Sequence, residues 1–255
     1  MAIPQIIHYC WLSNDPVPEE LKYYMTSWYK LMPDYKFIKW DFSRFDINQS
    51  DWVKEAYENK KYAFAADYIR LFALYTMGGI YLDMDVEVLK PYDDLLDMDY
   101  FMCYENSVAM EPEVAAFGAK PGLSWMKILL EYYEDRHFIK EDHTYETTPL
   151  PHVVKTVLGL KGISFNPAKS PNEMIWGGQN NEIKILPYEY FSPKSYATNK
   201  IETTTNTYSI HQFSGSWLPW EQRLERKIRL ALGLRPISIT YHLDKWIERL
   251  FHVKR

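Results

Sequence analysis

The sequence predicts an α/β fold with a largely parallel sheet flanked by helices. Short apolar runs alternate with segments whose apolar residues recur every three or four positions through the first half of the chain, which is typical of strands joined by crossover helices. The length of 255 residues and the hydrophobic content of 47% suit one domain with a full core. We find no internal repeat and no low-complexity segment.

The predicted elements begin with a strand, a helix, a second strand and a short helix. Residues 3–11 form an apolar strand, and a helix over 18–31 follows a loop that contains two prolines. Large apolar side chains over 35–40 indicate the second strand. The short helix is expected over 51–59, where an aspartate stands near the start.

The best-defined helix covers residues 62–77. Its apolar side chains recur at three- and four-residue steps, and the glycine pair Gly78 and Gly79 ends it as a C-terminal cap does. Residues 80–82 then form a buried central strand. The remaining expected elements are strands at 100–104, 115–119, 183–186 and 208–211, helices at 123–137, 220–232 and 241–253, and a loop-rich segment at 140–180.

Two carboxylates, Asp83 and Asp85, stand one residue apart where the central strand leaves the core. Side chains at i and i+2 of an extended chain point to the same side. Like charges side by side repel each other, and a cation relieves the repulsion. Such a pair can hold Mg²⁺ or Mn²⁺ while the metal also binds phosphate oxygens. The motif predicts a metal site and a phosphate-bearing substrate, although Asp-x-Asp also occurs in solvated loops.

Asp67 and Arg70 lie three residues apart on the helix that precedes the central strand. The spacing has two interpretations. It gives an ordinary helical ion pair, or it gives a nucleotide clamp in which Asp67 faces the ribose or base and Arg70 faces the phosphates. The aromatic content of 16% is similarly open, because it fits a tyrosine-rich core or a surface that stacks on sugars and bases.

The charge of the chain is unevenly distributed. The net charge is −5, yet residues 219–255 hold nine Lys and Arg against four Asp and Glu, a net of +5, which leaves −10 for the remainder. An acidic body with a basic tail does not suggest a nucleic-acid partner. Because apolar and basic residues interleave in the tail, it is either an amphipathic helix on an anionic membrane surface or a helix packed on the domain with a solvated basic face. We expect one domain over 1–218 and a helical extension over 219–255.

The location predicted from the sequence is the cytoplasm, with the tail as the candidate for peripheral membrane contact. Two cysteines do not suggest a disulfide framework and fit a reducing compartment. The first residues have neither a basic start nor a long apolar segment, so no signal peptide is expected. No apolar run reaches the length of about 18 residues that a membrane-spanning helix needs.

Three separated motifs resemble glycosyltransferase family 32. Residues 63–70 (Ala-Phe-Ala-Ala-Asp-Tyr-Ile-Arg) and 75–85 (Tyr-Thr-Met-Gly-Gly-Ile-Tyr-Leu-Asp-Met-Asp) are similar to its sugar-binding pattern, A-x-x-S-D-x-x-R and then Y-x-x-G-G-x-Y-x-D-x-D. Residues 3–11 resemble its opening I-P-K-x-I-H-x-x-W, and 211–217 its closing H-x-x-x-G-S-W. The core is also similar to that of the large clostridial glucosylating toxins. Ala66 departs from the pattern, because the family usually has serine there.

The resemblance implies a GT-A fold, a nucleotide-sugar donor, a divalent metal and retention of the anomeric configuration. By position, it makes Asp85 the firm metal ligand, Asp83 a contact to ribose or metal, and His211 a further metal ligand. A histidine ligand favours Mn²⁺ over Mg²⁺. The residues implied to bind the donor are Trp11, which stacks on the base, Asp67, Arg70 and Tyr81, which line the donor, and Ser216 and Trp217, which lie against the diphosphate.

The predicted function is metal-dependent transfer of a hexose, from UDP-glucose or UDP-galactose by resemblance, to a glycan or lipid-linked glycan in polysaccharide or capsule synthesis. The metal, Arg70 and the indole N–H of Trp217 would stabilise charge on the leaving phosphate. No covalent nucleophile is evident, and Asn106 and Glu105 are candidates for the acceptor side. A non-catalytic sugar- or nucleotide-binding module is the alternative. A phosphatase of the haloacid dehalogenase type is weaker, because Glu87 replaces its Thr or Val.

Overall fold

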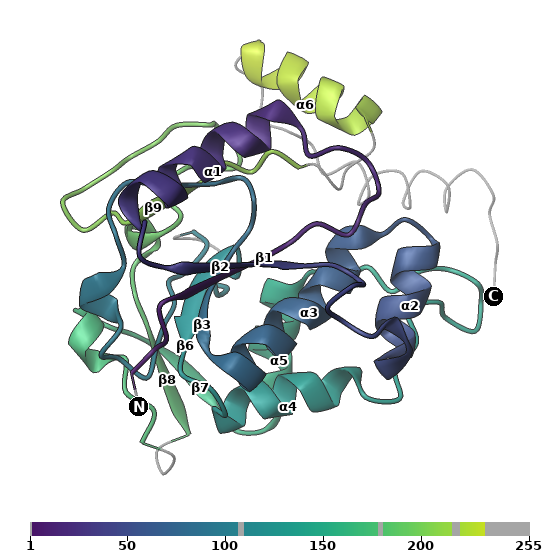
Figure 1. Ribbon diagram of the computed structural model, residues 1–255, viewed down its shortest axis with the longest axis horizontal. Helices are drawn as coiled ribbons and strands as arrows, with labels where there is room; N and C mark the ends of the chain where they lie inside the picture. The colour runs from purple at the N-terminus through teal and green to yellow at the C-terminus, as the bar shows by residue number, and fades with distance from the viewer. Residues whose placement is uncertain (1, 107–109, 178–180, 216–219, 233–255) are drawn as a thin grey trace, which may run out of the picture. The chain divides into compact units, whose positions relative to one another are not determined.

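The computed structural model describes residues 2–106, 110–177, 181–215 and 220–232 (Figure 1). The chain divides into two compact units. The first comprises Met1–Lys194 with Ile201–Gln212, and the second comprises Ser195–Lys200 with Phe213–Arg255. The predicted domain boundary at 218 and 219 lies outside the described residues and stays a prediction.

A five-stranded sheet forms the centre of the first unit, with the strand order β2-β1-β3-β6-β5. Strand β1 (Ile6–Cys10) pairs in parallel with β2 (Lys36–Trp40) and with β3 (Gly79–Leu82). Strand β6 (Ala116–Ala119) pairs antiparallel with β3 and with β5 (Tyr100–Phe101). The sheet is therefore mixed, because β6 runs against the other four strands.

This reversed strand corrects the prediction of a largely parallel sheet. Neighbouring parallel strands need a crossover of a dozen or more residues, usually a helix. Helix α1 (Glu19–Leu31) provides it between β1 and β2, and α2 (Asp51–Glu58) with α3 (Tyr62–Met77) provides it between β2 and β3. Among the described residues between β3 and β6 there is no α-helix, and β6 enters the sheet in the opposite direction.

Alternating side chains of β1 and β2 place helices on both faces of this part of the sheet. The ring of Tyr9 packs edge-on against Trp28 of α1, with centroids 5.9 Å apart. Trp40 points to the other face and packs edge-on against Phe72 of α3 at 6.0 Å. Figure 1 accordingly shows α1 and α3 on opposite sides of β1 and β2. The core between these layers is apolar and rich in aromatic rings.

The prediction of a helix over residues 62–77 is confirmed, since α3 has these bounds. Gly78 follows it with φ of 65° and Gly79 with φ of 112°. A β-carbon at Gly79 would lie 2.7 Å from the carbonyl oxygen of Ile6. The glycine pair therefore ends the helix and also lets β3 approach β1, and this fixes where the next carboxylates leave the sheet.

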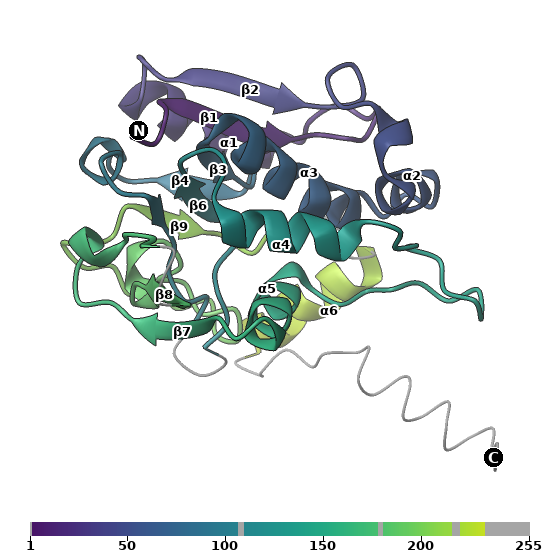
Figure 2. The same ribbon diagram turned by 90° about the horizontal axis from the view of Figure 1, so that it is seen from below.

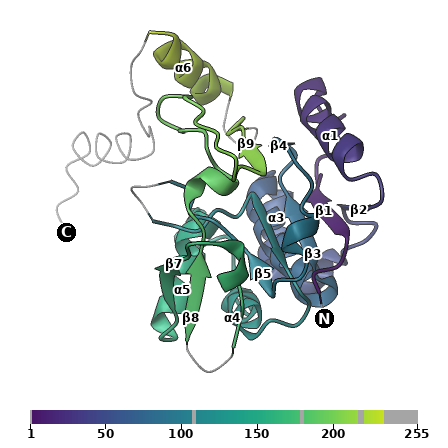
Figure 3. The ribbon, with the colours of Figure 1, turned by 90° about the vertical axis from the view of Figure 1, so that its left-hand side faces the viewer.

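The predicted loop-rich segment 140–180 needs a correction, because it contains a helix and a strand. Pro149 and Pro151 flank the start of helix α5 (Leu150–Leu160), where the missing N–H of proline does no harm. The proline pair thus stands at the start of a helix, within a segment that the sequence predicted to be loop-rich. Figure 2 shows α4 (Ser124–Tyr133) between α3 and α5. In Figure 3, α5 lies beside β7 (Ser164–Pro167) and β8 (Glu182–Ile185), which pair in parallel.

The remaining elements are short, apart from the helix of the second unit. They are β4 (Val86–Val88), β9 (Ser209–His211), helix α6 (Trp220–Ala231) and the 3₁₀ turns Ile47–Gln49, Asp93–Leu95, Pro171–Glu173 and Tyr188–Tyr190. In the second unit, the guanidinium of Arg226 on α6 donates to the carbonyl oxygens of Phe213 and Tyr196, at 3.2 and 3.1 Å. Helix α6 confirms one predicted helix, and the one predicted over 241–253 lies outside the described residues. No described helix is long and apolar enough to cross a membrane.

Candidate metal and donor site

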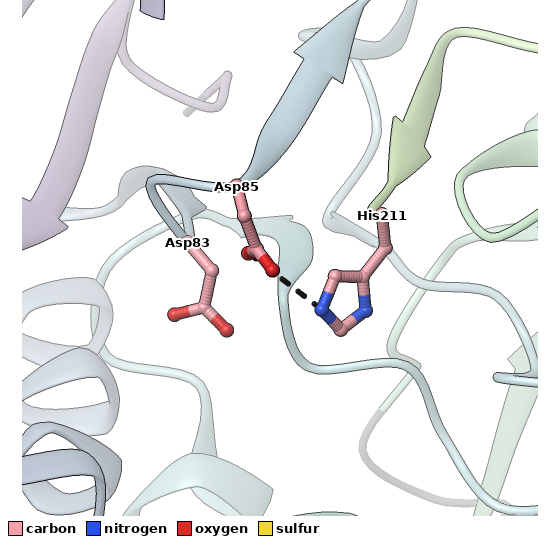
Figure 4. A group of neighbouring side chains, drawn as sticks. All are labelled: Asp83, Asp85 and His211. Atoms are coloured by element: carbon pink, nitrogen blue, oxygen red, sulfur yellow. Dashed lines mark ion pairs between the residues drawn. The ribbon is translucent and has the colours of Figure 1, made fainter. Parts of the chain in front are cut away.

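Asp83 and Asp85 lie in a tight turn between β3 and β4. The amide N–H of Val86 donates to the carbonyl oxygen of Asp83 at 2.9 Å, so the chain is not extended between the two aspartates. The turn, and not the expected alternation along a strand, brings the two carboxylates together. Figure 4 shows both carboxylates reaching from this turn.

His211 reaches the same place from the last strand of the first unit. Strand β9 pairs antiparallel with β4, with His211 opposite Val86, and the amide N–H of Gln212 donates to the carbonyl oxygen of Asp85 at 3.0 Å. The Nε2 atom of His211 lies 3.7 Å from Oδ1 of Asp85 (Figure 4). One ligand atom from each of Asp83, Asp85 and His211 lies within 4.8 Å of the others. The structure therefore gathers the three predicted metal ligands from segments over 120 positions apart.

The donor set fits a divalent cation of the expected kind. Two carboxylate oxygens and one imidazole nitrogen are ligands for Mn²⁺, and the carboxylates also suit Mg²⁺. Burial alone would lower the pKa of His211, but the carboxylates of Glu113 and Asp85 raise it to about 10. Burial raises the pKa of Asp83 above its usual value, since the ionised form loses hydration. Surroundings that hold a proton on this histidine attract positive charge, and a bound divalent cation would replace that proton.

Arg70 and Tyr81 hold the Asp83 carboxylate from behind. Nη1 of Arg70 lies 3.4 Å from Oδ2 of Asp83, and the Tyr81 hydroxyl donates to Oδ1 at 3.0 Å. The Arg70 guanidinium also lies over the Tyr81 ring, 4.6 Å from its centroid. Both side chains are buried. In this structure they orient Asp83, and their predicted contacts with a donor stay predictions.

Asp67 and Arg70 form an ion pair, with 3.0 Å between Oδ1 and Nη2. The helical ion pair of the simpler interpretation is therefore present, and it is buried, with side-chain exposures of 11% and 6%. Burial raises the pKa of Asp67 to about 7, against the opposing effect of Arg70. Nη1 of Arg70 also donates to the carbonyl oxygen of Val114 at 2.8 Å. The clamp interpretation remains a prediction, since these contacts are all within the protein.

Glu113 is a site residue that the sequence analysis missed. Its Oε2 lies 3.1 Å from Nδ1 of His211, and its Oε1 accepts the amide N–H of Ala115 at 2.7 Å. Burial alone would raise the pKa of Glu113, but His211 lowers it below its usual value. The pair is separated by 98 positions, and no local pattern announces it. The available signal was a single carboxylate shortly before an apolar strand, where a buried carboxylate needs a partner.

Glu105 lies near the same cluster, next to Asn106 and four residues beyond the end of β5. Burial and the charge of Glu113 raise the pKa of Glu105 to about 7. The backbone N–H of Glu105 donates to the carbonyl oxygen of Glu111 at 2.8 Å. The roles predicted for Glu105 and Asn106 on the acceptor side stay predictions.

Trp11 lies one residue beyond the end of β1 and is partly exposed. Its indole N–H donates to the carbonyl oxygen of Asp15 at 2.9 Å, which holds the ring against the loop that follows. Stacking of this ring on a base stays a prediction. Ser216 and Trp217 lie outside the described residues, and so do their predicted contacts with a diphosphate.

Residues 18–102 match the family model of the glycosyltransferase sugar-binding region containing a DXD motif. This segment is a glycosyltransferase sugar-binding region. Its DXD motif is Asp83-Met84-Asp85. The match covers about a third of the chain, and it confirms the resemblance to a glycosyltransferase sugar-binding region that the motifs indicated.

Known proteins similar to this chain include two fungal enzymes and one solved structure. The chain is 37% identical over 155 residues to inositol phosphoceramide mannosyltransferase 3 of Schizosaccharomyces pombe, covering 58% of this chain and 43% of that protein. It is 29% identical over 203 residues to the mannosyl phosphorylinositol ceramide synthase SUR1 of Saccharomyces cerevisiae, covering 76% and 49%. The chain therefore spans about half the length of these relatives. The PaToxG glycosyltransferase structure has a TM-score of 0.47 and 15% identity, covering 63% of this chain and 69% of that one.

Proposed function

We propose that the protein is a metal-dependent glycosyltransferase that moves a hexose from a nucleoside diphosphate sugar to an acceptor. One observation carries the proposal. Asp83, Asp85 and His211 place their ligand atoms within 4.8 Å of one another, and both aspartates belong to the DXD motif of a glycosyltransferase sugar-binding region. A non-catalytic binding module has no need for such a cluster. The family match likewise weighs against a phosphatase.

The residues present would divide the work of the reaction between them. When bound, a divalent cation would supply Lewis-acid stabilisation of the charge that builds on the leaving diphosphate. Asp83, Asp85 and His211 would hold it. Arg70 and Tyr81 fix both oxygens of Asp83, so this carboxylate is oriented before the donor arrives. Preorganisation of this kind spares the reorganisation that flexible side chains would need during the reaction.

The finer features of the proposal come from the motifs. They are a GT-A arrangement, retention of the anomeric configuration, stacking of the donor base on Trp11, and contact of the diphosphate with Ser216 and Trp217. The mixed sheet with helices on both faces supports the first of these. Retention is decided by the anomeric configuration of the product, which proton NMR reads directly from the reaction mixture.

Two sets of observations favour different sugars and different acceptors. The motifs favour a uridine nucleotide with glucose or galactose and a glycan or lipid-linked glycan acceptor. The names of two relatives favour mannose and an inositol phosphoceramide acceptor. Both alternatives share a hexose donor and fit an acceptor with a lipid portion. We propose a lipid-linked acceptor as the common expectation.

A cytoplasmic location with peripheral membrane contact also belongs to the proposal. Residues 219–255 carry a net charge of +5. Three apolar side chains at four-residue steps are exposed, namely Leu224 and Ile228 of α6 and Leu232 directly after it. Co-sedimentation with vesicles of increasing anionic lipid content measures this contact. Equal binding to neutral and anionic vesicles at low salt would contradict it.

The test of the function is a panel of purified UDP-glucose, UDP-galactose and GDP-mannose, each with Mn²⁺, scored by release of the nucleoside diphosphate. We expect one donor to be turned over, with release abolished by EDTA and by Asp85→Asn. Binding of a donor without release, with or without a lipid-linked acceptor, would favour the non-catalytic module. Release that continues in EDTA or in the Asp85→Asn variant would contradict the metal site.

A further inference from the structure

Glu113 is a buried carboxylate that contacts a proposed metal ligand from the side away from Asp85. Its side chain is 2% exposed. Oε2 faces Nδ1 of His211 at 3.1 Å, whereas Nε2 of the same ring faces Asp85 at 3.7 Å. Glu113 therefore stands behind His211 and leaves the nitrogen on the cluster side to the cation.

The residues that follow Glu113 contact the other half of the site. The carbonyl oxygen of Val114 accepts from Arg70 at 2.8 Å, and that of Ala115 accepts the amide N–H of Asp83 at 2.7 Å. Oε1 of Glu113 in turn holds the amide N–H of Ala115 at 2.7 Å. The segment 113–115 thus connects His211 with Asp83 and with the arginine that orients Asp83, through hydrogen bonds at three consecutive residues.

We propose that Glu113 is a positioning residue that fixes the proton of His211 on Nδ1 and, through the segment 113–115, sets where His211 lies relative to Asp83. The proposal rests on the metal site of the proposed function. An ionised carboxylate only accepts hydrogen bonds, so the His211 proton must stand on Nδ1. The lone pair of Nε2 is then directed at the cation. Partners of this kind fix the orientation of metal-bound histidines and raise their basicity.

A second glutamate–histidine pair in the same chain has a similar bonding pattern but no neighbouring metal ligands within the part of the chain that the structure describes. Glu55 faces Nδ1 of His137 at 2.6 Å with Oε1 and accepts the amide N–H of Ile139 at 3.0 Å with Oε2. The bonding pattern matches that of Glu113, but the His137 side chain is 58% exposed. Among the described residues, neither Glu55 nor His137 belongs to a group that could hold a metal. Glu55 is therefore a matched control for loss of a glutamate–histidine contact.

The decisive variant is Glu113→Gln, which keeps the shape and removes one acceptor. Its amide oxygen can accept from Ala115 or from His211, but not from both in this geometry. With the oxygen on Ala115, the NH₂ group faces Nδ1, so the imidazole proton moves to Nε2 and blocks the cation. We expect the dissociation constant for Mn²⁺, with MnCl₂ as the probe and free Mn²⁺ read by EPR, to rise about 10- to 100-fold. Glu55→Gln should leave it within about twofold of wild type, in keeping with the absence of any metal ligand at that pair.

Thermal unfolding of both variants separates positioning from folding. The proposal is supported if Glu113→Gln melts as a cooperative unit and still loses Mn²⁺ affinity. It is overturned if Mn²⁺ affinity is unchanged while Asp85→Ala abolishes binding, and this outcome leaves the proposed function intact. No Mn²⁺ binding by the wild-type protein would overturn both the metal site and this inference. If Glu113→Gln does not fold, ¹⁵N NMR of wild-type His211 with saturating Mg²⁺ decides, because a proton on Nε2 with none on Nδ1 contradicts the proposal.

Discussion

His8 and His211 are both largely buried histidines, yet their surroundings give them opposite charge. His8 lies inside β1, where one ring nitrogen bonds the carbonyl oxygen of Gly78 at 2.8 Å and the other accepts the indole N–H of Trp40 at 3.0 Å. Burial lowers the pKa of His8 to about 4, so the ring is neutral at pH 7. His211 faces the carboxylates of Glu113 and Asp85, which overcome burial and raise its pKa to about 10.

The difference teaches that neighbouring charge, and not burial, separates a structural histidine from a candidate ligand. A neutral ring with both nitrogens occupied by a carbonyl and an indole has nothing to offer a cation. A ring with one nitrogen held by a carboxylate and the other turned toward a second carboxylate is poised to bind one. Both histidines belong to β-strands, so strand membership alone does not distinguish them, and the folded arrangement supplies the physical reason for the difference.

The largest expected effect comes from removing Asp85, one of the two carboxylates that raise the pKa of His211. Asp85→Ala should reduce transfer about a thousandfold, a loss of ~4 kcal/mol of transition-state stabilisation. Asp85→Asn should fail similarly, because the charge and not the shape binds the cation. The measurement is kcat for nucleotide release with saturating donor and Mn²⁺. The control is Asp97→Asn, which changes an exposed aspartate outside the cluster and should keep wild-type turnover.

Retention of activity in the Asp85 variants would contradict the assignment of His211 as a metal ligand, and with it the contrast between His211 and the structural histidine His8. More than about a tenth of wild-type turnover in either Asp85 variant corresponds to a loss below ~1.4 kcal/mol, which is too small for a firm metal ligand. His211 would then be a charged structural histidine, and the cluster would need another explanation.

The second prediction concerns the pH dependence of stability at His8. The unfolded chain protonates this histidine below about pH 6.5, whereas the folded protein resists protonation down to about pH 4. The unfolded state therefore binds more protons in this window, and the contribution of His8 to stability is present above pH 6.5 and is lost as the pH falls toward 4. A difference of between two and three pKa units corresponds to about 3 kcal/mol.

The measurement is urea unfolding of wild type and His8→Gln at pH 7, 6, 5 and 4. Glutamine also offers one donor and one acceptor, but it does not titrate. The stability of wild type relative to the variant should therefore fall by about 3 kcal/mol from pH 7 to 4. A difference that does not change with pH would mean that His8 is not held neutral, and the contrast with His211 would disappear.

Much of the fold could be predicted from the sequence wherever a single segment contains the pattern that determines its secondary structure. The periodic apolar face and the glycine pair gave α3 its bounds, and the run before Asp83 gave β3. The direction of β6 could not be predicted, because it depends on strand pairing between distant segments. Helix α5 was missed because prolines at its start resemble those of a loop.

The candidate site divides in the same way. Asp83 and Asp85 could be identified from one short motif, and His211 from a second motif. The turn that joins the aspartates, the orientation of Asp83 by Arg70, and the place of Glu113 behind His211 arise only when distant segments meet. Tertiary contacts of this kind leave no period or spacing in the chain, and single-sequence reasoning could not find them.

The smallest expected effect is that of Trp11→Ala, which compares two residues at neighbouring places in the chain, His8 inside β1 and Trp11 just past its end. β1 buries His8 in its interior, while Trp11 lies one residue past its end, partly exposed. If structural roles stop where the strand leaves the core, Trp11→Ala should change function and spare stability. Stacking of a base on an aromatic ring contributes about 1–3 kcal/mol, so the donor KM should rise about tenfold. Stacking is similar in the ground and transition states, and kcat should therefore change little.

Steady-state kinetics with varied donor, together with the thermal unfolding midpoint, measures both sides of this last prediction. Trp176→Ala is the matched control, because Trp176 is also partly exposed and its indole N–H also donates a hydrogen bond, to Ser124 at 2.9 Å. The control should leave the donor KM near the wild-type value. If Trp11→Ala instead lowers the unfolding midpoint and leaves KM unchanged, Trp11 is a structural residue like His8. The residues that bind the donor would then have to be sought beyond the end of β1, closer to Asp83 and Asp85.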